Sequence, residues 1–421
     1  MTTDLPPGWV IAHLGDLCTP RVGKVVPAED DARPYLSLDN IAGEVGRIDG
    51  WECASDYRSQ SVELSPGDIA YARLRPYLNK VARVDREALG SAELIVLPPS
   101  QALVPKFLQY QLLSSRFVKF AQRRSTGDRP RLKWRQMRHY ALEVPPLAEQ
   151  ERIVATIEEH FSHLDAAEDS ISTALDRIEV TRRSVLNAAF TGQLVRQDAD
   201  DEPHTHTHTH THTPSDLPRG WTLTTLGKIF EIVGGATPRT KEPVFWGGEI
   251  PWVTPEDLSN HDGVEIARGR RTITLTGYES TSTHLLPKGA VLFSSRAPIG
   301  YAAIAAQPLC TNQGFKSLIP PEGIGSRYVY WYLRYATPAI REMASGTTFK
   351  EISKKRMASV PFVLAPSRER ERIVSAIEEH FSRLDATDYV LSTALEQIET
   401  TRRSVLNTAF AGQLAVARRP E

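Results

Sequence analysis

The chain has 421 residues, enough for two or three domains that each bury a core of their own. Its formal net charge is −1 with 24% charged residues, which excludes a protein that binds nucleic acid through overall positive charge. Three cysteines without C-x-x-C spacing argue against a disulfide framework and a zinc site. No apolar run approaches about 18 residues and the N-terminal residues MTTDLPPGW show no basic region followed by an apolar core, so we expect a soluble, cytoplasmic protein.

Two globular segments are expected, the first at residues 1–147 and the second at 217–365. They open alike, with LPPGW and LPRGW, and both reach Leu-Gly after the same interval, but the match then fades. Short apolar runs then alternate with Pro, Gly and Asn, as in mixed α/β domains rich in strands and loops. Each segment ends in a short helical stretch, at 107–122 and 328–343, before an exit bounded by proline.

A long repeat follows each segment. The stretch Glu151–Leu194 returns as Glu371–Leu414 with 31 identities in 44 aligned positions, so one arrangement occurs twice in the chain. Each copy carries two series of mostly apolar residues seven apart, which is a heptad pattern. The positions expected to pair the helices are Ile157, Phe161, Leu164, Glu168, Ile171, Leu175, Ile178 and Arg182 in the first copy, and Ile377, Phe381, Leu384, Asp388, Leu391, Leu395, Ile398 and Arg402 in the second.

Each copy predicts one uninterrupted helix. No Pro or Gly occurs before Gly192 or Gly412, which fit helix-ending positions. At 1.5 Å per residue, each helix would be roughly 65 Å long. A single helix would expose its apolar stripe, so we expect the two copies to pair. Two amphipathic helices that pack separately, each on its own domain, are the alternative.

The segment Asp198–Asp216 between the halves is acidic, contains alternating His and Thr, and has no apolar periodicity. This composition predicts a flexible linker. Metal binding by its five histidines is an alternative, but a repeated codon pair explains the tract more simply. The expected order is a domain at 1–147, a spacer helix at 148–195, a linker at 196–216, a domain at 217–365, and a spacer helix with a tail at 366–421.

The most informative local charge lies at residues 116–138, where nine Lys and Arg side chains face a single acid, Asp128. Phe120 and Trp134 are interleaved with the cations. This is the electrostatic footprint expected for contact with phosphates, and a solvated basic face is the alternative. The candidate DNA-binding residues of this run are Arg123, Arg124, Arg129, Arg131, Lys133 and Arg135.

Other candidate cations stand in Pro- and Gly-rich loops, from which side chains could reach base edges. They are Arg73, Arg75 and Lys80 in the first half, and Arg239, Lys241, Arg296 and Lys316 in the second. The part of the second half that matches the basic run adds Lys350, Lys354, Lys355 and Arg356. The signal is weaker there, because Glu342 and Glu351 lie among these cations.

Catalytic and metal-binding patterns are mostly missing. The stretch Gly234–Lys241 suggests a phosphate loop but lacks the terminal Gly-Lys-Ser/Thr. His160 and His163 lie one helical turn apart beside Glu159, yet Arg383 stands where the second copy would need the matching histidine. No G-x-S-x-G, H-E-x-x-H or Walker motif occurs. We therefore expect no catalytic residue, metal or cofactor.

Several features together resemble the specificity subunit of type I restriction-modification enzymes, over essentially the whole chain. They are the two divergent domains alternating with near-identical helices, the LPPGW and LPRGW openings, IPWVTPEDL at Ile250–Leu258, and PPLAEQERIV at Pro145–Val154. The second exit departs from this last motif at Ser367, Arg368 and Arg370. The resemblance implies an α+β fold with two mixed α/β target recognition domains, separated by two long helices that pair as an antiparallel coiled coil, with an internal pseudo-two-fold repeat.

The resemblance also implies a function. Each recognition domain would read one half of a bipartite DNA sequence. Two modification subunits would bind the helices and supply the methyl donor and the chemistry, and restriction subunits would join to cleave. A partner would flip the target adenine out of a duplex that the recognition domains distort. A free-standing DNA-binding regulator, a coiled-coil scaffold and a fused methyltransferase are the competing classes, and the last would need a cofactor motif that the sequence lacks.

An antiparallel pair makes a prediction about register, because the numbers of facing residues then have a constant sum. Glu168 and Arg402 add up to 570, and so do Arg182 and Asp388. The symmetry of the repeat makes the two sums equal, but it does not make the facing charges opposite. We therefore expect two ion pairs in the seam.

Overall fold

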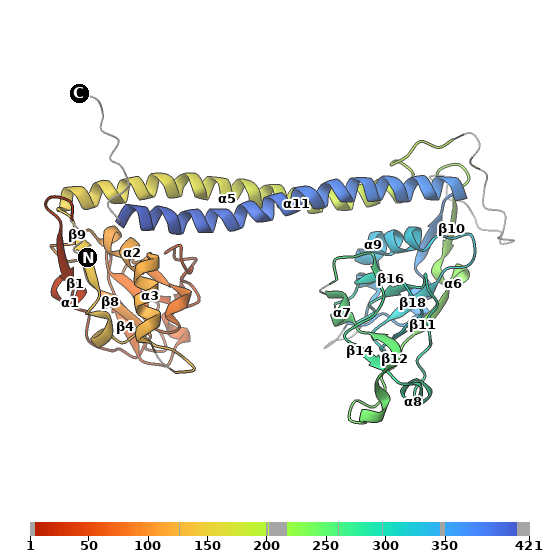
Figure 1. Ribbon diagram of the computed structural model, residues 1–421, viewed down its shortest axis with the longest axis horizontal. Coiled ribbons are helices and arrows are strands. Elements are labelled where there is room, and N and C mark those ends of the chain that lie inside the picture. Colours follow the sequence, from red (N-terminus) through yellow and green to blue (C-terminus); the bar gives the residue numbers. More distant parts are fainter. Residues whose placement is uncertain are drawn as a thin grey trace. The chain divides into compact units, whose positions relative to one another are not determined.

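The computed structural model describes residues 5–125, 127–198, 201, 217–259, 261–296, 298–345 and 350–410. The chain forms two compact units (Figure 1). Unit 1 contains residues 1–173 and 391–421, and unit 2 contains residues 174–390. Most of the expected linker at 196–216, including its five histidines, lies outside the described residues, as does Gly412.

The two predicted long helices are confirmed as α5 (Leu147–Phe190) and α11 (Ser367–Phe410), each of 44 residues. Each begins four residues before the repeat, directly after a proline. Helix α5 ends as expected, since Gly192 follows it with a φ of +75° and the backbone NH groups of Gln193 and Leu194 donate to the carbonyl of Ala188.

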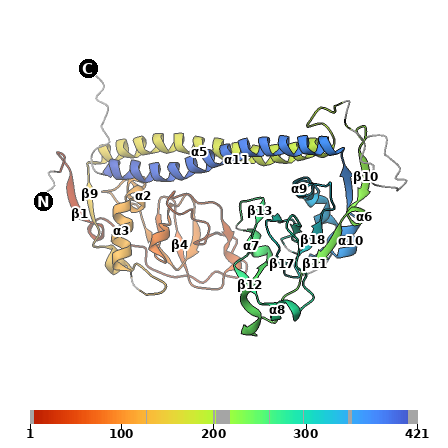
Figure 2. The same ribbon diagram turned by 45° about the vertical axis from the view of Figure 1, so that its right-hand side comes forward.

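The helices pair antiparallel in each unit (Figure 2). In unit 1 the first part of α5 lies beside the last part of α11, with Arg402 Nη2 2.8 Å from Glu168 Oε2. In unit 2 the last part of α5 lies beside the first part of α11, with Arg182 Nη2 3.0 Å from Asp388 Oδ2. Both predicted ion pairs, with the sum of 570, are therefore present.

Unit 1 adds three sheets and several short helices to its share of α5 and α11. The sheets are β1 with β9, the order β3-β2-β7-β4 and the order β6-β5-β8, and β2 runs parallel to β7. The elements are β1 (Val10–His13), α1 (Leu14–Leu17), β2 (Pro34–Leu36), β3 (Glu52–Cys53), η1 (Ala54–Asp56), β4 (Ser61–Leu64), β5 (Ile69–Ala72), η2 (Pro76–Leu78), β6 (Val81–Arg83), β7 (Ala88–Ser91), β8 (Leu94–Leu97), α2 (Pro105–Leu113), α3 (Ser115–Arg124), α4 (Trp134–Met137) and β9 (Ala141–Val144).

The core of unit 1 continues from the strands into the helix pair. All four side chains of β5 and all four of β8 are buried, as the continuous apolar runs of central strands predict. Tyr71, Phe107 and Phe117 are fully buried in one cluster with Ile157 of α5 and Leu406 of α11. Burial of such a side chain contributes about 1.5–3 kcal/mol, so α2 and α3 are held firmly against the helix pair.

Unit 2 also has three sheets. They are β10 with β19, the order β11-β18-β15-β16-β13 and the order β14-β12-β17. The elements are β10 (Thr222–Thr225), α6 (Leu226–Ile229), β11 (Glu231–Gly234), η3 (Pro243–Phe245), β12 (Trp246–Val253), α7 (Pro255–Ser259), β13 (Glu265–Ile266), β14 (Arg271–Ile273), α8 (Leu275–Glu279), β15 (Val291–Phe293), β16 (Ala302–Ala305), β17 (Cys310–Thr311), β18 (Lys316–Ile319), α9 (Ser326–Met343), α10 (Lys354–Ala358) and β19 (Pro361–Leu364).

Helix α9 carries the core of unit 2. Its side chains Tyr328, Tyr332, Ala336 and Ile340 are buried at intervals of four, as one face of a helix requires. They belong to one cluster with strand residues such as Phe293 and with the parts of α5 and α11 that lie in this unit. The mixed α/β character predicted for both segments is confirmed.

The repeated Leu-Gly has a structural cause. In each unit the first strand pairs with the strand that leads into the long helix, and the backbone NH of Leu14 or Leu226 donates into the turn before that strand. A Cβ on Gly15 would lie 2.8 Å from Arg138 Cβ, and a Cβ on Gly227 would lie 2.6 Å from Ala358 Cβ. No other residue fits at this close approach without a shift of the backbone.

Candidate nucleic-acid interface

Two of the candidate loops of unit 1 lie side by side. The loop between β5 and β6 meets the segment after α3, because the backbone NH of Arg75 donates to Pro130 O at 2.8 Å and that of Leu132 donates to Arg73 O at 2.9 Å. Arg73, Arg75 and Arg131 are thus gathered on one surface, although they come from separate parts of the chain.

One carboxylate joins two of these cations. The Nε atoms of Arg73 and Arg131 both donate to Glu93 Oε2, at 2.9 and 3.1 Å. Partial burial alone would raise the pKa of Glu93, but the hydrogen bonds from both guanidinium groups outweigh it and lower this pKa below its usual value. Glu93 is therefore ionised near neutral pH and holds both arginines in place.

The turn at residues 75–79 is rigid and strained. Arg75 and Asn79 adopt positive φ angles of +50° and +45°, which are unfavourable for residues other than glycine. The Asn79 amide donates to Leu113 O, a buried bond of 2.9 Å that holds the turn. Arg75 is exposed, whereas Lys80 Nζ donates to Leu38 O at 2.6 Å and turns inward. Of the two, Arg75 is the better candidate for contact with a ligand.

The basic run of residues 116–138 largely keeps its charge at the surface. Arg116 pairs with Glu143, and Arg131 with Glu93. Within the described part of the chain, no acid lies within ion-pair distance of the other seven cations of the run, which are all exposed: Lys119, Arg123, Arg124, Arg129, Lys133, Arg135 and Arg138. These side chains can contact phosphates without first breaking an ion pair.

Unit 2 has an equivalent surface with the charges rearranged. The segment after α9 meets the loop after β15, because the backbone NH of Ile352 donates to Ser295 O at 3.0 Å. Glu351 Oε2 accepts from Arg296 Nε at 2.8 Å, and its Oε1 lies 3.4 Å from Lys316 Nζ. Glu351, which weakened the sequence signal, is the residue that joins the two candidate cations.

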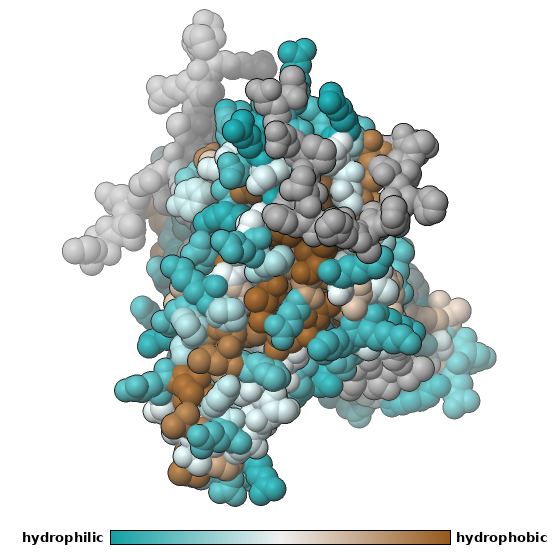
Figure 3. Space-filling model, turned by 90° about the vertical axis from the view of Figure 1, so that its right-hand side faces the viewer, coloured by the Kyte–Doolittle hydropathy of each residue, from teal (hydrophilic) through white to brown (hydrophobic). Residues whose placement is uncertain are grey.

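The other candidates of unit 2 fall into two groups. Lys350, Lys354 and Lys355 are exposed beside this surface, whereas Arg356 Nη1 donates to Met343 O at 2.8 Å. Arg239 and Lys241 are exposed in the loop between β11 and η3. The loop that carries Arg239 and Lys241 lies at the end of unit 2 that contains β12 and α8 (Figure 1). The surface at this end of unit 2 has apolar residues among polar ones (Figure 3).

Sequence reasoning missed Arg271. Its guanidinium carbon lies 3.4 Å from the ring centroid of Trp246, which in turn meets Trp252 edge-on at 5.0 Å. The Trp246 indole NH donates to Arg239 O at 3.2 Å, so this stack also supports the candidate loop. The IPW motif, which contains Trp252, was visible in the sequence, but Trp246 precedes this motif and the cation that stacks on Trp246 comes from a different strand, β14.

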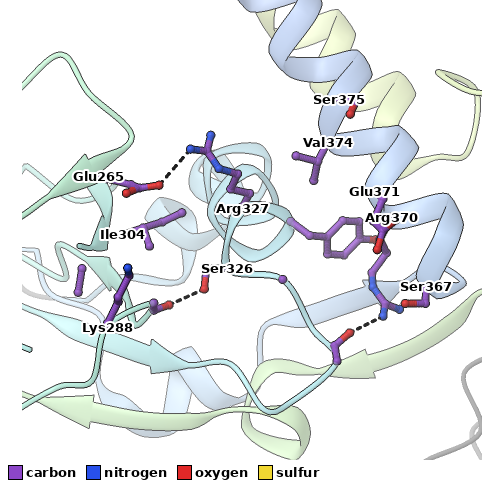
Figure 4. A pocket seen from close by; sticks show the side chains of 15 residues that line it. Glu265, Lys288, Ile304, Ser326, Arg327, Ser367, Arg370, Glu371, Val374 and Ser375 are labelled. Carbon is purple, nitrogen blue, oxygen red and sulfur yellow. Dashed lines mark hydrogen bonds and ion pairs between the residues drawn. The ribbon is translucent and has the colours of Figure 1, made fainter. Parts of the chain in front are cut away.

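A pocket of about 540 Å³ lies in unit 2 where α9 begins beside α11 (Figure 4). Arg327 on its wall bridges Glu265 and Glu378, and buried Arg370 donates to the carbonyls of Gly323 and Ala365. Burial lowers the pKa of Arg370. Arg327 and Arg370 are thus already bonded to groups of the protein. The pocket is therefore better described as the junction between the domain and α11 than as a catalytic site.

Gln150 takes the place of Arg370 in unit 1. Its amide donates to Pro145 O at 3.0 Å and Ala102 O at 2.9 Å, and its oxygen accepts from Val104 N. Both side chains bind the carbonyl five residues earlier, so the departure of the second exit from the family motif leaves the junction intact. Over the described ranges, no three His, Cys, Asp or Glu side chains form a possible metal site, and no helix is long and apolar enough to cross a membrane.

Comparison with known proteins gives this geometry a context. A family model described as the type I restriction modification DNA specificity domain matches residues 218–399. The type I restriction enzyme MjaIX specificity subunit of Methanocaldococcus jannaschii is 38% identical over 186 residues, which span 43% of this chain and only 42% of that protein. The putative MjaX specificity subunit of the same organism is 22% identical over 98% of this chain and 95% of that protein.

A solved structure shares the whole fold. It is a chain from a study of complex assembly and conformational transition in the type I R-M system, with a TM-score of 0.76 and 23% identity. The match covers 98% of this chain and 100% of that chain. It shows that the arrangement of sheets and long helices described above is an established fold.

Proposed function

We propose that the chain is a specificity subunit of a type I restriction-modification enzyme and selects the DNA sequence on which such an enzyme acts, a proposal that its similarity to such subunits supports. The domains at 1–147 and 217–365 would each read one half of a bipartite target. The observation that carries this proposal is that, in both units, two loops from separate parts of the chain meet and one carboxylate there joins two cations.

The two surfaces predict an asymmetric target. A dimer of identical readers would favour a palindrome, whereas two different readers in one chain favour two different half-sites. The exposed cations of residues 116–138 would mainly position unit 1 on phosphates, and the loop arginines would reach base edges. Helices α5 and α11 would set the spacing of the two half-sites.

Catalysis would come from other subunits. We propose that two modification subunits bind the helix pair and supply methyl transfer, and that restriction subunits complete the endonuclease. Co-expression with the modification subunits tests this directly. Recovery of one complex that methylates a defined bipartite sequence supports the proposal, whereas recovery of this chain alone as an active repressor contradicts it.

A domain exchange tests the division of labour. Residues 217–365 are replaced by the matching segment of another specificity subunit, and the methylated sequence is mapped in cells. We expect one half-site to change and the other to stay, because each unit has its own core. A change in both half-sites would contradict the proposal that each domain reads alone.

A further inference from the structure

Each unit places one carboxylate among the cations of its loop surface. Glu93 joins Arg73 and Arg131 in unit 1, and Glu351 joins Arg296 and Lys316 in unit 2. A carboxylate repels DNA phosphate, so it would weaken binding if these cations served affinity alone. Its presence on both surfaces therefore calls for a different physical role.

The two carboxylates come from different segments relative to one backbone bridge: Glu93 lies in the turn between β7 and β8, beside the bridge, whereas Glu351 is itself a bridge residue. The bridge pairs Leu74 with Arg131 in unit 1, and Arg296 with Glu351 in unit 2. The segment that follows α3 in unit 1 thus contributes a cation, Arg131, whereas the segment that follows α9 in unit 2 contributes the acid. Two unrelated loop sequences reach one arrangement by different routes, which indicates that the arrangement itself is needed.

The atoms used by the arginines show what the arrangement provides. Arg73, Arg131 and Arg296 all donate to the carboxylate through Nε. Among the described residues, the terminal Nη atoms of these three side chains have no hydrogen-bond partner. An arginine held at Nε has a fixed plane and presents its Nη pair outward, and this fork matches the O6 and N7 acceptors of guanine.

We propose that Glu93 and Glu351 are positioning residues that determine specificity, each for the half-site that its own unit reads. Each carboxylate fixes its arginine forks for base contact and cancels part of the charge that would otherwise bind any phosphate. The proposal rests on the function proposed above and extends it to named residues. Both acids are partly exposed, with side-chain exposures of 26% and 33%, so DNA can reach the groups beside them.

The test uses the full chain with its modification subunits and the variants Glu93→Gln and Glu351→Gln. Binding is measured at several salt concentrations to the target duplex, to duplexes with one half-site scrambled, and to an unrelated duplex. We expect Glu93→Gln to lower the ratio of specific to unrelated binding about tenfold, since one bidentate base contact contributes about 1–3 kcal/mol. The log-log salt slope should steepen by roughly 0.9–1.8 as one or two cations become free for phosphate.

The position of the effect separates this role from general damage. Glu93→Gln should relax only the half-site read by unit 1, and Glu351→Gln only the other. Glu143→Gln is the matched control, because Glu143 also pairs with an arginine of unit 1, Arg116, away from the two-loop surface. An effect of Glu93→Gln no larger than that of the control, or one spread equally over both half-sites, overturns the proposal.

A second variant covers the case in which Glu93→Gln folds poorly. Arg131→Lys keeps the positive charge but lacks the fork, so it should relax the same half-site without changing the salt slope. Unchanged discrimination in Arg131→Lys would also overturn the proposal. A wild-type complex that prefers no duplex over its scrambled versions would instead refute the proposed function, so the two failures are distinguishable.

Discussion

Units 1 and 2 use the same contacts where they meet the long helices and different contacts on their loop surfaces. At the helices, a cation of α2 in unit 1 or of α9 in unit 2 pairs with a glutamate at equivalent positions of the repeat, and an aromatic ring meets a phenylalanine edge-on or tilted. The pairs are Lys106–Glu158 and Tyr110–Phe161 in unit 1, and Arg327–Glu378 and Trp331–Phe381 in unit 2. On the loop surfaces, the carboxylate comes from the turn between β7 and β8 in unit 1 and from the segment after α9 in unit 2.

This difference teaches where the fold tolerates change. Contacts with α5 and α11 are repeated in kind even though the domain residues differ, so the junction constrains the chemistry of its side chains. On the loop surface, the two units share only the arrangement of one acid between two cations. Different sequences can supply this arrangement. Four sets of substitutions test this difference between the junctions and the loop surfaces.

The largest effect is expected where the ends of the long helices enter each core. Phe190→Ala and Phe410→Ala remove equivalent rings, each of which is buried against aromatic residues of its own unit. Each should destabilise its unit by about 3–5 kcal/mol, as for other buried phenylalanines. Hydrogen exchange resolved by unit measures this. Equal loss of protection in both units after either change would show that the units do not respond separately.

Charge reversal in the seam should have the next largest effect. Glu168→Arg places a second cation beside Arg402, whose side chain is only 7% exposed, and should cost about 3 kcal/mol. Arg402→Glu added to it should recover much of this loss. Asp388→Arg should cost less, because Arg182 is more exposed. Chemical unfolding of these three variants and of Arg402→Glu alone measures the coupling, and a double variant no better than the sum of the single changes would contradict the register.

A smaller effect, dependent on pH, is expected at Asp257 in the IPWVTPEDL motif. Burial would raise its pKa, but hydrogen bonds from the backbone and side chains of Arg270 and Thr254 lower it. Because the pKa is lower in the folded than in the unfolded protein, where it is about 4, the ionised carboxylate stabilises the fold above pH 4. This stabilisation is lost as the pH falls through the pKa of the folded protein. Asp257→Asn should therefore cost roughly 1–3 kcal/mol at pH 7 and progressively less below pH 4. A constant difference across this range would contradict it.

The smallest effect per side chain concerns the exposed cations of unit 1. Replacing Arg129, Lys133 and Arg135 by Ala should flatten the log-log salt slope of DNA binding by about 2–3 and weaken all duplexes similarly. The triple change Lys350, Lys354 and Lys355 to Ala is the counterpart in unit 2. Unchanged binding in the first variant would mean that the basic run is only a solvated face.

The long helices and their register could be predicted because they depend on local periodicity and on a repeat within one chain. Five heptads without Pro or Gly fix a helix, and a constant sum fixes which charges face each other. The mixed α/β character of the segments followed from short apolar runs and turn residues. These signals need no knowledge of contacts between distant residues.

The candidate surface could be predicted only in part, because its geometry depends on such contacts. Nothing near Arg73 in the sequence indicates that it shares Glu93 with Arg131. In the sequence, nothing separates Lys80 and Arg356 from the other candidate cations, yet the side chains of both donate hydrogen bonds to backbone carbonyls. Counting charges in the sequence treats every acid as weakening the signal for DNA binding. Such a count therefore missed that Glu93 and Glu351 each hold two cations together on this surface.

The composition of unit 1 has a consequence for biosynthesis. Its core includes Leu406, Ala409 and Phe410, and the Phe410 ring meets Phe107 edge-on at 5.5 Å. At about 5–20 residues per second, a ribosome would need on the order of 10–50 s after residue 173 to deliver these partners. Unit 2 is continuous from residue 174 to 390 and can close its core earlier, although its synthesis begins later. The half made first is therefore the half finished last, and its unfilled core is exposed to chaperones and to aggregation in the meantime.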